Sequence, residues 1–435
     1  MFRWLIDKLA PPPNQSPPQD ATVAVTAAPS KPDYSGLLRR RAIYNRHWQI
    51  AAYALTLREL PHAKHSTHAY RDDEVLLCQV ERLLANHDFK HTDIWVEMAW
   101  SNIAQLLLHD FSNLPVLRVI AHGNVNLSAA DLIELLPQIS QRNIILGATA
   151  KHWHQSHPTL GEQLKIVALS IQSPDFAVLS QQVAICRQIA PHAQLWINDV
   201  DSREAAEACF QLGADFVSGQ VFTWPEAQQI HFPDSFIRLN QILQLVRQNA
   251  DAKLIADELK SDPALSARLL RYVNSAALGL SHPISNLDQA IVVVGNQRLY
   301  RWLSLLLFSS KGEQELDETL LEAALNRARL MELAGQKQFN HVECELLFLT
   351  GLFSLLDFLL RVPRALLLKE LNPPEQVIKT LLGDSTPFTP YFELALSSEL
   401  AGPSIDQLAA CQLSAGDFNR LQMEATLWTF SALAT

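Results

Sequence analysis

The 435-residue sequence contains little glycine and cysteine, and it has no excess of basic residues. Fourteen glycines are few for this length, which favours a helix-rich chain. Lys and Arg number 35 against 45 Asp and Glu, and the net charge of −10 disfavours broad nucleic-acid binding, which requires a basic face. No C-x-x-C pair occurs, so we expect free thiols in a reducing cytosol rather than disulfides. The five cysteines are Cys78, Cys186, Cys209, Cys344 and Cys411.

Long apolar runs are also missing from the sequence. No window of about 18 uninterrupted apolar residues occurs, so we predict no transmembrane helix. The first ten residues, MFRWLIDKLA, lack a small-residue cleavage site, which argues against a signal peptide. We therefore expect a cytoplasmic protein. Phe2, Leu5, Ile6 and Leu9 share one helical face, so residues 1–10 are either a frayed terminus or a helix that docks on a membrane surface or a partner.

Three segments differ in pattern. Residues 1–33 combine the short N-terminal helix with a Pro-rich stretch, which we interpret as a disordered linker. In residues 34–233 strands alternate with helices such as Asp73–Asn86 and Asn102–Leu108, a pattern typical of a parallel sheet closed into a (β/α) barrel. Residues 234–435 are predicted to be all-α, with one long helix at Glu343–Leu360. The predicted strands are Leu37–Tyr44, Trp48–Arg58, Asp93–Met98, Val116–Ala121, Asn143–Thr149, Leu164–Ser170, Gln194–Asn198 and Asp215–Ser218.

The stretch from Asp262 to Phe308 predicts three helices with clear ends. Asp262 is a good N-cap for the first helix, and Pro263 suits its first position. Ser285 with Asp288 resembles a capping box for the second helix, with Asp in the usual Glu place. Gly295 then ends that helix, and Asn296 is expected to cap the third. No nucleophile, acid pair or phosphate loop occurs here, so the stretch is expected to pack and to present a surface.

The same stretch resembles a known family. The runs D-P-x-L-S-x-x-L-L-R-x-V-N-S-A and I-S-N-L-x-Q-A-I-x-x-x-G, beginning at Asp262 and Ile284, are similar to the HDOD domain, a helical relative of the HD phosphohydrolases. A catalytic HD domain holds metals with an adjacent His-Asp pair. By the resemblance, Ser354-Leu355 stands where that pair is expected, and Arg327 where a ligating His is expected. The resemblance therefore implies the fold without the chemistry.

The preceding domain resembles an EAL domain, a barrel that hydrolyses cyclic diguanylate. Residues 197–202, Ile-Asn-Asp-Val-Asp-Ser, align with the family's Ala-Glu-x-Val-Glu-Thr. Residues 213–219, Gly-Ala-Asp-Phe-Val-Ser-Gly, align with Gly-x-Asp-x-x-Gln-Gly, and Pro225 aligns with the closing proline. The order EAL then HDOD is a known pairing, so the chain resembles a two-domain EAL–HDOD signalling protein with a degenerate barrel.

EAL chemistry needs carboxylates at the barrel mouth, which hold two divalent metals that activate a water. The Glu-Ala-Leu signature falls on Tyr53-Ala54-Leu55, which by the resemblance puts Ala54 at the first metal ligand. The paired aspartates become Thr149-Ala150, and the Glu of the Ala-Glu pair becomes Asn198. Asp201 alone keeps a carboxylate. We therefore predict no enzyme and no cofactor; the alternatives are a cyclic diguanylate sensor and a residual cyclic diguanylate phosphodiesterase.

Two histidine-rich loops follow predicted strands and are expected at the barrel mouth, where imidazoles at this spacing are able to bind zinc. Histidine is equally common in solvated loops, and no Cys or acidic partner is interleaved here. We keep metal binding as an alternative rather than as the prediction. The candidate ligands are His62 and His65, with His68 nearby, and His152, His154 and His157.

Basic and aromatic residues give two further hypotheses. In a strand, Arg39 and Arg41 share one face and Arg40 takes the other, so an exposed sheet edge is expected rather than a phosphate or partner patch. The tryptophans near strand ends are expected to plug the barrel or cover its rim, and a ligand pocket is the alternative. They are Trp153, Trp196 and Trp224.

The function predicted from these patterns is non-catalytic. We expect a bacterial signal-transduction protein that acts through protein–protein interaction, with an inactive EAL-like domain and an HDOD module. Its partners are expected to be signalling proteins or a second copy of the chain. Asn274 and Ser275 lie at a helix end inside the HDOD signature, where a structural cap is favoured over a partner contact. The candidate partner-binding residues are Asn274, Ser275, Arg271 and Arg298.

Overall fold

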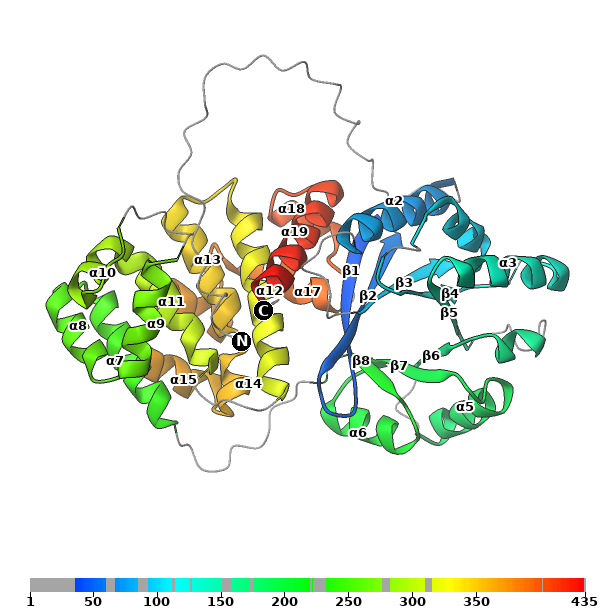
Figure 1. The fold of residues 1–435 in the computed structure, drawn as a ribbon, viewed down its shortest axis with the longest axis horizontal. Coiled ribbons are helices and arrows are strands. Elements are labelled where there is room, and N and C mark those ends of the chain that lie inside the picture. Colours follow the sequence, from blue (N-terminus) through cyan, green and yellow to red (C-terminus); the bar gives the residue numbers. More distant parts are fainter. Residues whose placement is uncertain are drawn as a thin grey trace, which may run out of the picture. The chain divides into compact units, whose positions relative to one another are not determined.

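The computed structural model describes most of the chain. It covers residues 36–59, 67–84, 93–111, 114–125, 127–150, 158–171, 176–219, 221, 232–275, 282–309, 315–400 and 402–433. By contacts the chain divides into two compact units (Figure 1). One contains residues 32–224 and 393–423 and is called the barrel unit. The other contains residues 225–392 and 424–435 and is called the helical unit.

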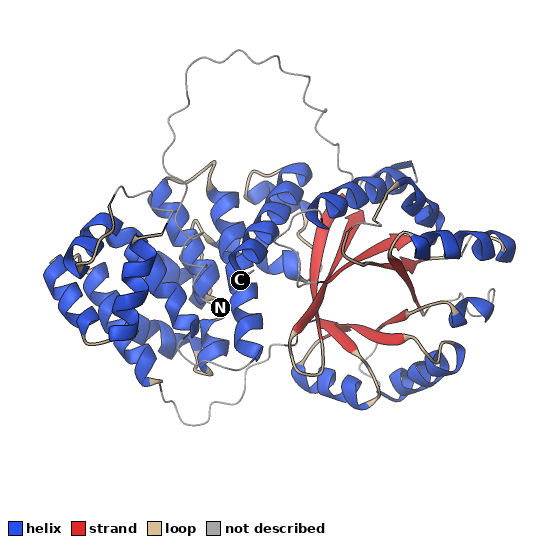
Figure 2. Ribbon diagram, in the orientation of Figure 1, coloured by secondary structure: helices blue, strands red, loops and turns tan. Residues whose placement is uncertain are grey.

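Eight strands close into a barrel in sequence order (Figure 2). β1 runs antiparallel to both of its neighbours, whereas the pairs from β2 to β8 are parallel. All eight strands lie where the alternating pattern predicts them, so the sequence prediction of a (β/α) barrel is confirmed. The strands are β1 (Gly36–Tyr44), β2 (Ile50–Glu59), β3 (Asp93–Ala99), β4 (Leu117–His122), β5 (Ile144–Thr149), β6 (Ile166–Ser170), β7 (Gln194–Val200) and β8 (Phe216–Gly219).

Helices connect the strands on the outside of the barrel. Two differ from the prediction: α2 begins before Asp73, and the segment predicted as an α-helix at Asn102–Leu108 is a 3₁₀-helix, η2. The amphipathic spacing of that segment is compatible with both helix types, so its pattern does not separate them. The connecting elements are α2 (Thr67–Leu84), η2 (Trp100–Leu108), α3 (Ala129–Gln141), η3 (Pro158–Glu162), α5 (Phe176–Ile189) and α6 (Arg203–Gln211).

Strand alternation fills the barrel interior with large side chains. Trp95, Trp196 and Phe216 meet edge to face, with ring centroids 5.2 and 5.3 Å from Trp95. Trp196 is fully buried, which confirms that it plugs the barrel. The interior cluster comprises Ile43, Ala52, Ala54, Trp95, Ile120, Ile166, Ala168 and Trp196, with Ile145 and Phe216 packed against it.

The seam between β1 and β8 is short, since the register pairs only Tyr44 with Val217. Farther along β1, the buried Asn419 amide accepts a hydrogen bond from the Leu38 N–H at 2.7 Å and donates one to the Gly36 carbonyl at 2.9 Å. Asn419 lies on a C-terminal segment that the sequence prediction assigned with 234–435 to the helical domain, whereas by contacts residues 393–423 group with the barrel. The helices there are α17 (Thr389–Glu399), α18 (Ile405–Ala410) and α19 (Ala415–Leu433); α17 and α19 contribute residues to both units.

The helical unit is all-α, as predicted. The predicted single helix Glu343–Leu360 is two helices, because Ser354 and Leu355 interrupt it. Gly351 allows α13 to approach the α12 backbone, since an added Cβ would lie 2.5 Å from Ala328 Cα. The helices are α7 (Asp234–Arg247), α8 (Ala252–Lys260), α9 (Pro263–Val273), α10 (Leu287–Val294), α11 (Asn296–Leu306), η5 (Leu307–Ser309), α12 (Glu315–Gly335), α13 (His341–Phe353), α14 (Leu356–Leu360), α15 (Arg364–Leu371) and α16 (Glu375–Leu382).

Two of the predicted helix caps are wrong. Asp262 does cap α9 by accepting from the Leu265 N–H. The N-cap of α10, however, is Asn286, whose side chain accepts from the Asp288 N–H, so the predicted Ser285–Asp288 box does not form. Asn296, predicted to cap α11, is instead its first residue, and the N-cap is Gly295, which also ends α10. The φ of 78° at Gly295 suits a residue without Cβ.

No single helix among the described residues is long and apolar enough to cross a bilayer. One pair, His341–Leu360 with Arg364–Leu371, meets the length and composition requirement jointly but is bent by 116°.

Candidate functional site

Four charged residues meet at the carboxyl-terminal end of the barrel strands. The Arg41 guanidinium pairs with Glu97 from β3 and lies 3.6 Å from Asp199 on β7. Arg39 lies 3.7 Å from the same Asp199 carboxylate. We call Arg39, Arg41, Glu97 and Asp199 the mouth cluster. Two positive and two negative charges balance within it.

Burial distinguishes the members of the mouth cluster. The Arg41 side chain is 6% exposed and Glu97 is 16% exposed, whereas Asp199 is 47% exposed. The Arg41 Cζ also lies 5.2 Å from the Trp196 ring centroid. Asp199 has a φ of 59°, a left-handed conformation uncommon outside glycine, and β7 pairs irregularly with β8 at this point. The two arginines therefore hold a strained aspartate at the barrel rim.

The predicted exposed edge at residues 39–41 is wrong. Alternation along β1 is as predicted, but the two faces meet the barrel interior and its covering layer rather than solvent. Arg41 points inward, and Arg40, 5% exposed, lies over the Tyr53 ring with its Cζ 4.2 Å from the centroid. Aromatic rings and carboxylates on neighbouring strands offset the free-energy cost of burying these guanidinium groups. The sequence of β1 by itself does not predict these partners.

A hydrogen-bond chain crosses from β7 to β8 inside the barrel. The Trp196 Nε1–H donates to Ser218 Oγ at 3.2 Å, and the Ser218 hydroxyl donates to Asn198 Oδ1 at 3.0 Å. All three residues are buried. Asn198 is the position that the EAL resemblance assigns to a glutamate. Its neutral amide here serves an internal network.

Of the other positions singled out from the sequence, only Asp201 carries a charge. Ala54 is fully buried in the interior cluster, and Thr149 ends β5 at the mouth. Asp201 follows β7 and is exposed. Among the residues that the structure describes, no group of three or more His, Cys, Asp or Glu side chains is arranged to hold a metal ion.

Several predicted candidates lie outside the described residues. Both histidine loops fall there, with His62 and His65 in 60–66 and His152, His154 and His157 in 151–157. The His68 side chain, Trp153 and Trp224 are likewise not described. Zinc binding by these loops therefore stays an alternative prediction.

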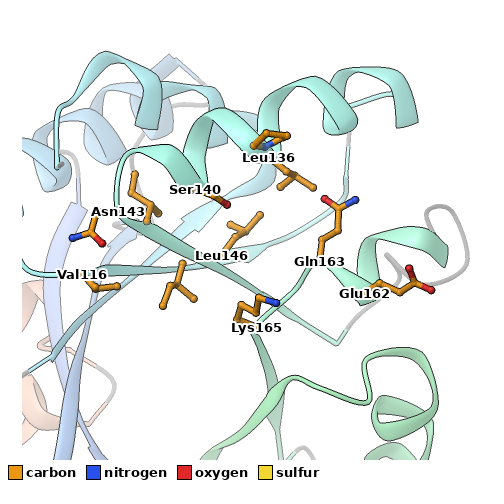
Figure 3. A pocket seen from close by; sticks show the side chains of 11 residues that line it. Val116, Leu136, Ser140, Asn143, Leu146, Glu162, Gln163 and Lys165 are labelled. Atoms are coloured by element: carbon orange, nitrogen blue, oxygen red, sulfur yellow. The ribbon is translucent and has the colours of Figure 1, made fainter.

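A pocket of about 500 Å³ lies on the outer wall of the barrel, away from the mouth (Figure 3). Leu136 from α3 faces Leu146 of β5 across it, and Glu162, Gln163 and Lys165 come from the η3–β6 connection. The strand residues that line it come from the amino-terminal half of β5, and Val116 and Lys165 directly precede β4 and β6. The pocket is therefore separate from the mouth cluster.

In the helical unit, the two positions matched to HD metal ligands do meet. The Arg327 guanidinium donates to Ser354 Oγ at 2.6 Å, and both residues are buried. Three residues on, the buried Asp357 carboxylate accepts from Arg364 Nε at 2.6 Å. Burial raises the pKa of Asp357, although Arg364 opposes this shift. At the place where the resemblance expects a His-Asp pair, Ser354 is thus hydrogen-bonded to Arg327, and Leu355 has an apolar side chain.

A second buried charge group lies between α11, α12 and α13. Arg301 Nη1 donates to Glu332 at 2.8 Å and to Glu345 at 2.7 Å. Burial favours protonation of Glu332, but Arg301 and Arg329 outweigh it and hold the pKa of Glu332 below its usual range. Arg301 also lies over the Phe348 ring, 3.5 Å from its centroid. Both terminal nitrogens of Arg301 are thus paired, since Nη2 also donates to Glu332 at 3.2 Å.

The four partner-binding candidates separate by contacts. The Asn274 amide donates to the Leu270 and Ile284 carbonyls and accepts from the Ile284 N–H at 2.6 Å, which gives it a structural role. Ser275 is half-buried. Arg271 is exposed and Arg298 is half-exposed, and neither makes a salt bridge within the described residues. A partner contact by these residues stays a prediction.

Residues 230–357 match the family model of the HDOD domain, so this part of the helical unit is an HDOD domain. Among curated proteins, the chain is 28% identical over 203 residues to the uncharacterized protein YuxH of Bacillus subtilis, covering 45% of this chain and 48% of YuxH. It is 25% identical over 232 residues to a Vibrio cholerae protein named cyclic di-GMP phosphodiesterase CdgJ, covering 53% and 54%. The chain spans about half the length of these relatives.

Solved structures of EAL proteins are also similar to this chain. An EAL domain protein of Listeria monocytogenes aligns with a TM-score of 0.31 at 16% identity, covering 46% of this chain and 95% of that one. The EAL-domain protein YkuI of Bacillus subtilis, in complex with c-di-GMP and calcium, aligns with a TM-score of 0.33 at 13% identity, covering 55% and 73%.

The mouth cluster is the part of the site that sequence reasoning missed. Glu97 lies two residues after Trp95 on β3, and side chains two residues apart in a strand share one face of the sheet. The sequence therefore places the Glu97 carboxylate on the interior face with Trp95. The same reasoning places Arg41 inside the barrel once β1 is known to be closed on both sides. Asp199 carries no such signal, because its orientation depends on the irregular β7–β8 pairing.

Proposed function

We propose that this chain is a non-catalytic signal-transduction protein, in which a degenerate EAL-like barrel and an HDOD domain act through protein–protein interaction. The observation that carries the proposal is Arg41. Its guanidinium is a permanent cation paired with Glu97 and Asp199 at the barrel mouth, where EAL chemistry would require divalent metals. Carboxylates neutralised by an arginine are poor ligands for a second cation.

The HDOD domain supports the same proposal. Arg327 is hydrogen-bonded to Ser354, and the neighbouring carboxylate of Asp357 is bound by Arg364. An arginine therefore lies beside Ala54 in the barrel and beside Ser354 in the HDOD domain, two of the positions that the resemblances assign to metal ligands. The function left to such scaffolds is to bind another macromolecule and to transmit its presence.

The interaction is tested with the full chain. Exposed Arg271 and half-exposed Arg298 are changed to glutamate together, and capture of partners from a bacterial lysate is compared with that of wild type. The control variant is Lys379→Glu on α16, whose side chain is 52% exposed. We expect R271E/R298E to lose a partner that K379E and wild type retain. Identical capture by all three proteins would remove these arginines from the interface.

The alternative is a cyclic diguanylate sensor or residual phosphodiesterase, and the relative CdgJ, which is named as such an enzyme, favours it. Equilibrium dialysis of the full chain against cyclic diguanylate separates the sensor from the proposed function. We expect no retention up to about 100 μM, a limit that leaves less than ~5.5 kcal/mol of binding free energy. Retention below that concentration would favour the sensor.

A further inference from the structure

The pocket on the outer wall of the barrel combines an apolar lining with two charged side chains. Its volume of about 500 Å³ lies within the range of roughly 300–1,000 Å³ that small-molecule sites occupy. Ile144 and Leu146 of β5 and Leu136 of α3 supply the apolar lining. The charged side chains are Glu162 and Lys165, which are both exposed and come from the η3–β6 connection (Figure 3). A molecule in this pocket therefore meets apolar and charged groups together.

The crossover from β5 to β6 accounts for the position of the pocket. Among the described residues, this crossover contains only the five-residue 3₁₀-helix η3, whereas α3 and α5 on the two neighbouring crossovers have 13 and 14 residues. A 3₁₀ turn is narrower than an α-helical turn, so it covers less of the sheet. It leaves room between α3 and the start of β6, and the pocket occupies that room.

The two charged side chains of the pocket are not paired. Glu162 and Lys165 carry opposite charges three residues apart, yet neither makes a salt bridge within the described chain. At the same spacing on a helix, Asp257 and Lys260 do pair, at 2.8 Å. The difference lies in the backbone, because the chain leaves η3 at Glu162 and enters β6 at Ile166. Both charges therefore remain available to a ligand.

Hydrogen bonds fix both walls of the pocket. The Lys165 N–H donates to the Leu146 carbonyl at 3.0 Å, and the Lys165 carbonyl accepts from the Gln194 N–H at 2.8 Å. On the α3 side, Asn143 has a φ of 62° and donates its side-chain amide to the Leu114 carbonyl at 2.8 Å. The backbone that surrounds the pocket is thus held in place by the protein itself.

The pair of charges restricts the chemistry of the ligand. A simple anion would face the Glu162 carboxylate, and a simple cation would face the Lys165 ammonium group, so each would meet a like charge. A molecule with both charges satisfies both side chains, and the apolar lining selects one with a hydrocarbon side chain. We propose that this pocket binds a small zwitterion with an apolar side chain, a free amino acid such as leucine or a dipeptide of such residues. Its carboxylate pairs with Lys165 and its ammonium group with Glu162. This site goes beyond the proposed function and does not depend on it.

A ligand-detected NMR titration of the full chain with L-leucine and with the dipeptide Leu-Leu tests the site. Three analogues each lack one feature: N-acetyl-L-leucine has no ammonium group, L-leucinamide has no carboxylate, and glycine has no apolar side chain. We expect saturable binding of leucine or Leu-Leu with a dissociation constant of about 1 mM or lower. Each analogue should bind about tenfold more weakly than leucine, since it loses one of the three contacts.

Variants of the two exposed residues locate the binding. Glu162→Gln should weaken leucine about tenfold and strengthen N-acetyl-L-leucine, because it removes an attraction to the ammonium group and a repulsion of the anion. Lys165→Gln should weaken leucine similarly and strengthen L-leucinamide. Glu207→Gln on α6, whose side chain is 53% exposed, is the matched control and should bind all ligands as wild type does.

Two results would overturn the proposal. One is the absence of saturable binding of both leucine and Leu-Leu up to about 10 mM, a concentration that a site of the expected affinity would fill. The other is binding that E162Q and K165Q leave unchanged, since the ligand would then lie elsewhere on the chain.

Discussion

Each unit has a buried arginine at or beside a position that the family resemblance assigns to a metal ligand. Arg41 is buried at the barrel mouth, and Arg327 is buried beside Ser354 in the HDOD domain. A guanidinium does not lose its charge at any physiological pH, and it needs carboxylates or carbonyls around it once buried. Each arginine thereby fixes the side chains around it. At the residue scale, the proposed function therefore depends on these two buried arginines.

Replacing Arg41 by methionine tests this at the barrel mouth. The R41M variant leaves the Glu97 carboxylate largely buried without its partner, which should lower the free energy of unfolding by about 3 kcal/mol. The measurement is urea denaturation at pH 7. Lys379→Met breaks an exposed pair with Glu375 and should leave the midpoint nearly unchanged. A small effect of R41M would mean that the mouth cluster is solvated and weak.

Glu332 predicts a pH dependence of stability. Its pKa in the folded protein lies below the usual 4.5, since Arg301 and Arg329 outweigh burial. The stability from ionised Glu332 is therefore complete above pH 4.5 and is lost as pH falls through the lower folded pKa. The E332Q variant should be about 3 kcal/mol less stable than wild type at pH 7, and the difference should narrow by pH 3.5.

Urea denaturation at the two pH values measures this difference. Glu375→Gln is the control, because the Glu375 carboxylate is also paired but exposed. E375Q should track wild type at both pH values. A gap between E332Q and wild type that stays constant from pH 7 to pH 3.5 would refute the role assigned to the Glu332 charge.

At the scale of elements, β1 depends on a segment distant in sequence. Asn419 bonds the Gly36 carbonyl and the Leu38 N–H with one side-chain amide, as a neighbouring strand would with its backbone. Arg39 Nε also donates to the Leu400 carbonyl. These contacts join residues more than 360 positions apart, so no window of local sequence contains their signal. The assignment of residues 393–423 to the barrel unit was unpredictable for this reason.

Changing Asn419 to aspartate tests the contact. N419D keeps an acceptor for the Leu38 N–H but loses the donor to Gly36 and sets a carboxylate against that carbonyl. We expect the free energy of unfolding to fall by about 2 kcal/mol, and amide exchange at Leu38 to accelerate. Denaturation and hydrogen–deuterium exchange measure the two effects. Asn124→Asp, at an exposed position after β4, should change neither.

Helix packing gives a further test at Gly351. Alanine normally stabilises a helix by about 1 kcal/mol relative to glycine. Here a new Cβ would lie 2.5 Å from Ala328 Cα and 2.6 Å from Ala328 N, both backbone atoms of α12. G351A should therefore lower the thermal midpoint, against the trend of helix propensity. A higher midpoint would show that α12 and α13 are able to separate without cost.

Sequence periodicity predicted the type and approximate bounds of an element wherever its apolar face is also the face that is buried in the fold. All strands and most helices were predicted, since alternation and 3.6-residue spacing report which face is buried. The failures were local ambiguities that packing decides. Asn286 and Ser285 are both good cap residues, and only Asn286 has the geometry to accept from Asp288. Similarly, the burial of Arg40 depends on Tyr53 in the next strand, which β1 alone does not reveal.

At the scale of the whole molecule, the predicted order of a (β/α) barrel followed by a helical HDOD domain is confirmed. Position-by-position resemblance identified Ala54, Asn198 and Ser354 as altered, and the structure shows what each contacts. What surrounds them was beyond prediction, because Arg41, Glu97 and Asp199 come together only when the barrel closes. Our central proposal is that these arginine networks leave the protein without metal-dependent hydrolysis.

A multiple-turnover assay of the full chain with labelled cyclic diguanylate and saturating Mg²⁺ or Mn²⁺ tests that claim most directly. The Asp201→Ala variant, which removes the carboxylate retained in the EAL-like motif, is measured in parallel. We predict no product above the metal-only background for either protein. Turnover by wild type that D201A abolishes would contradict the account.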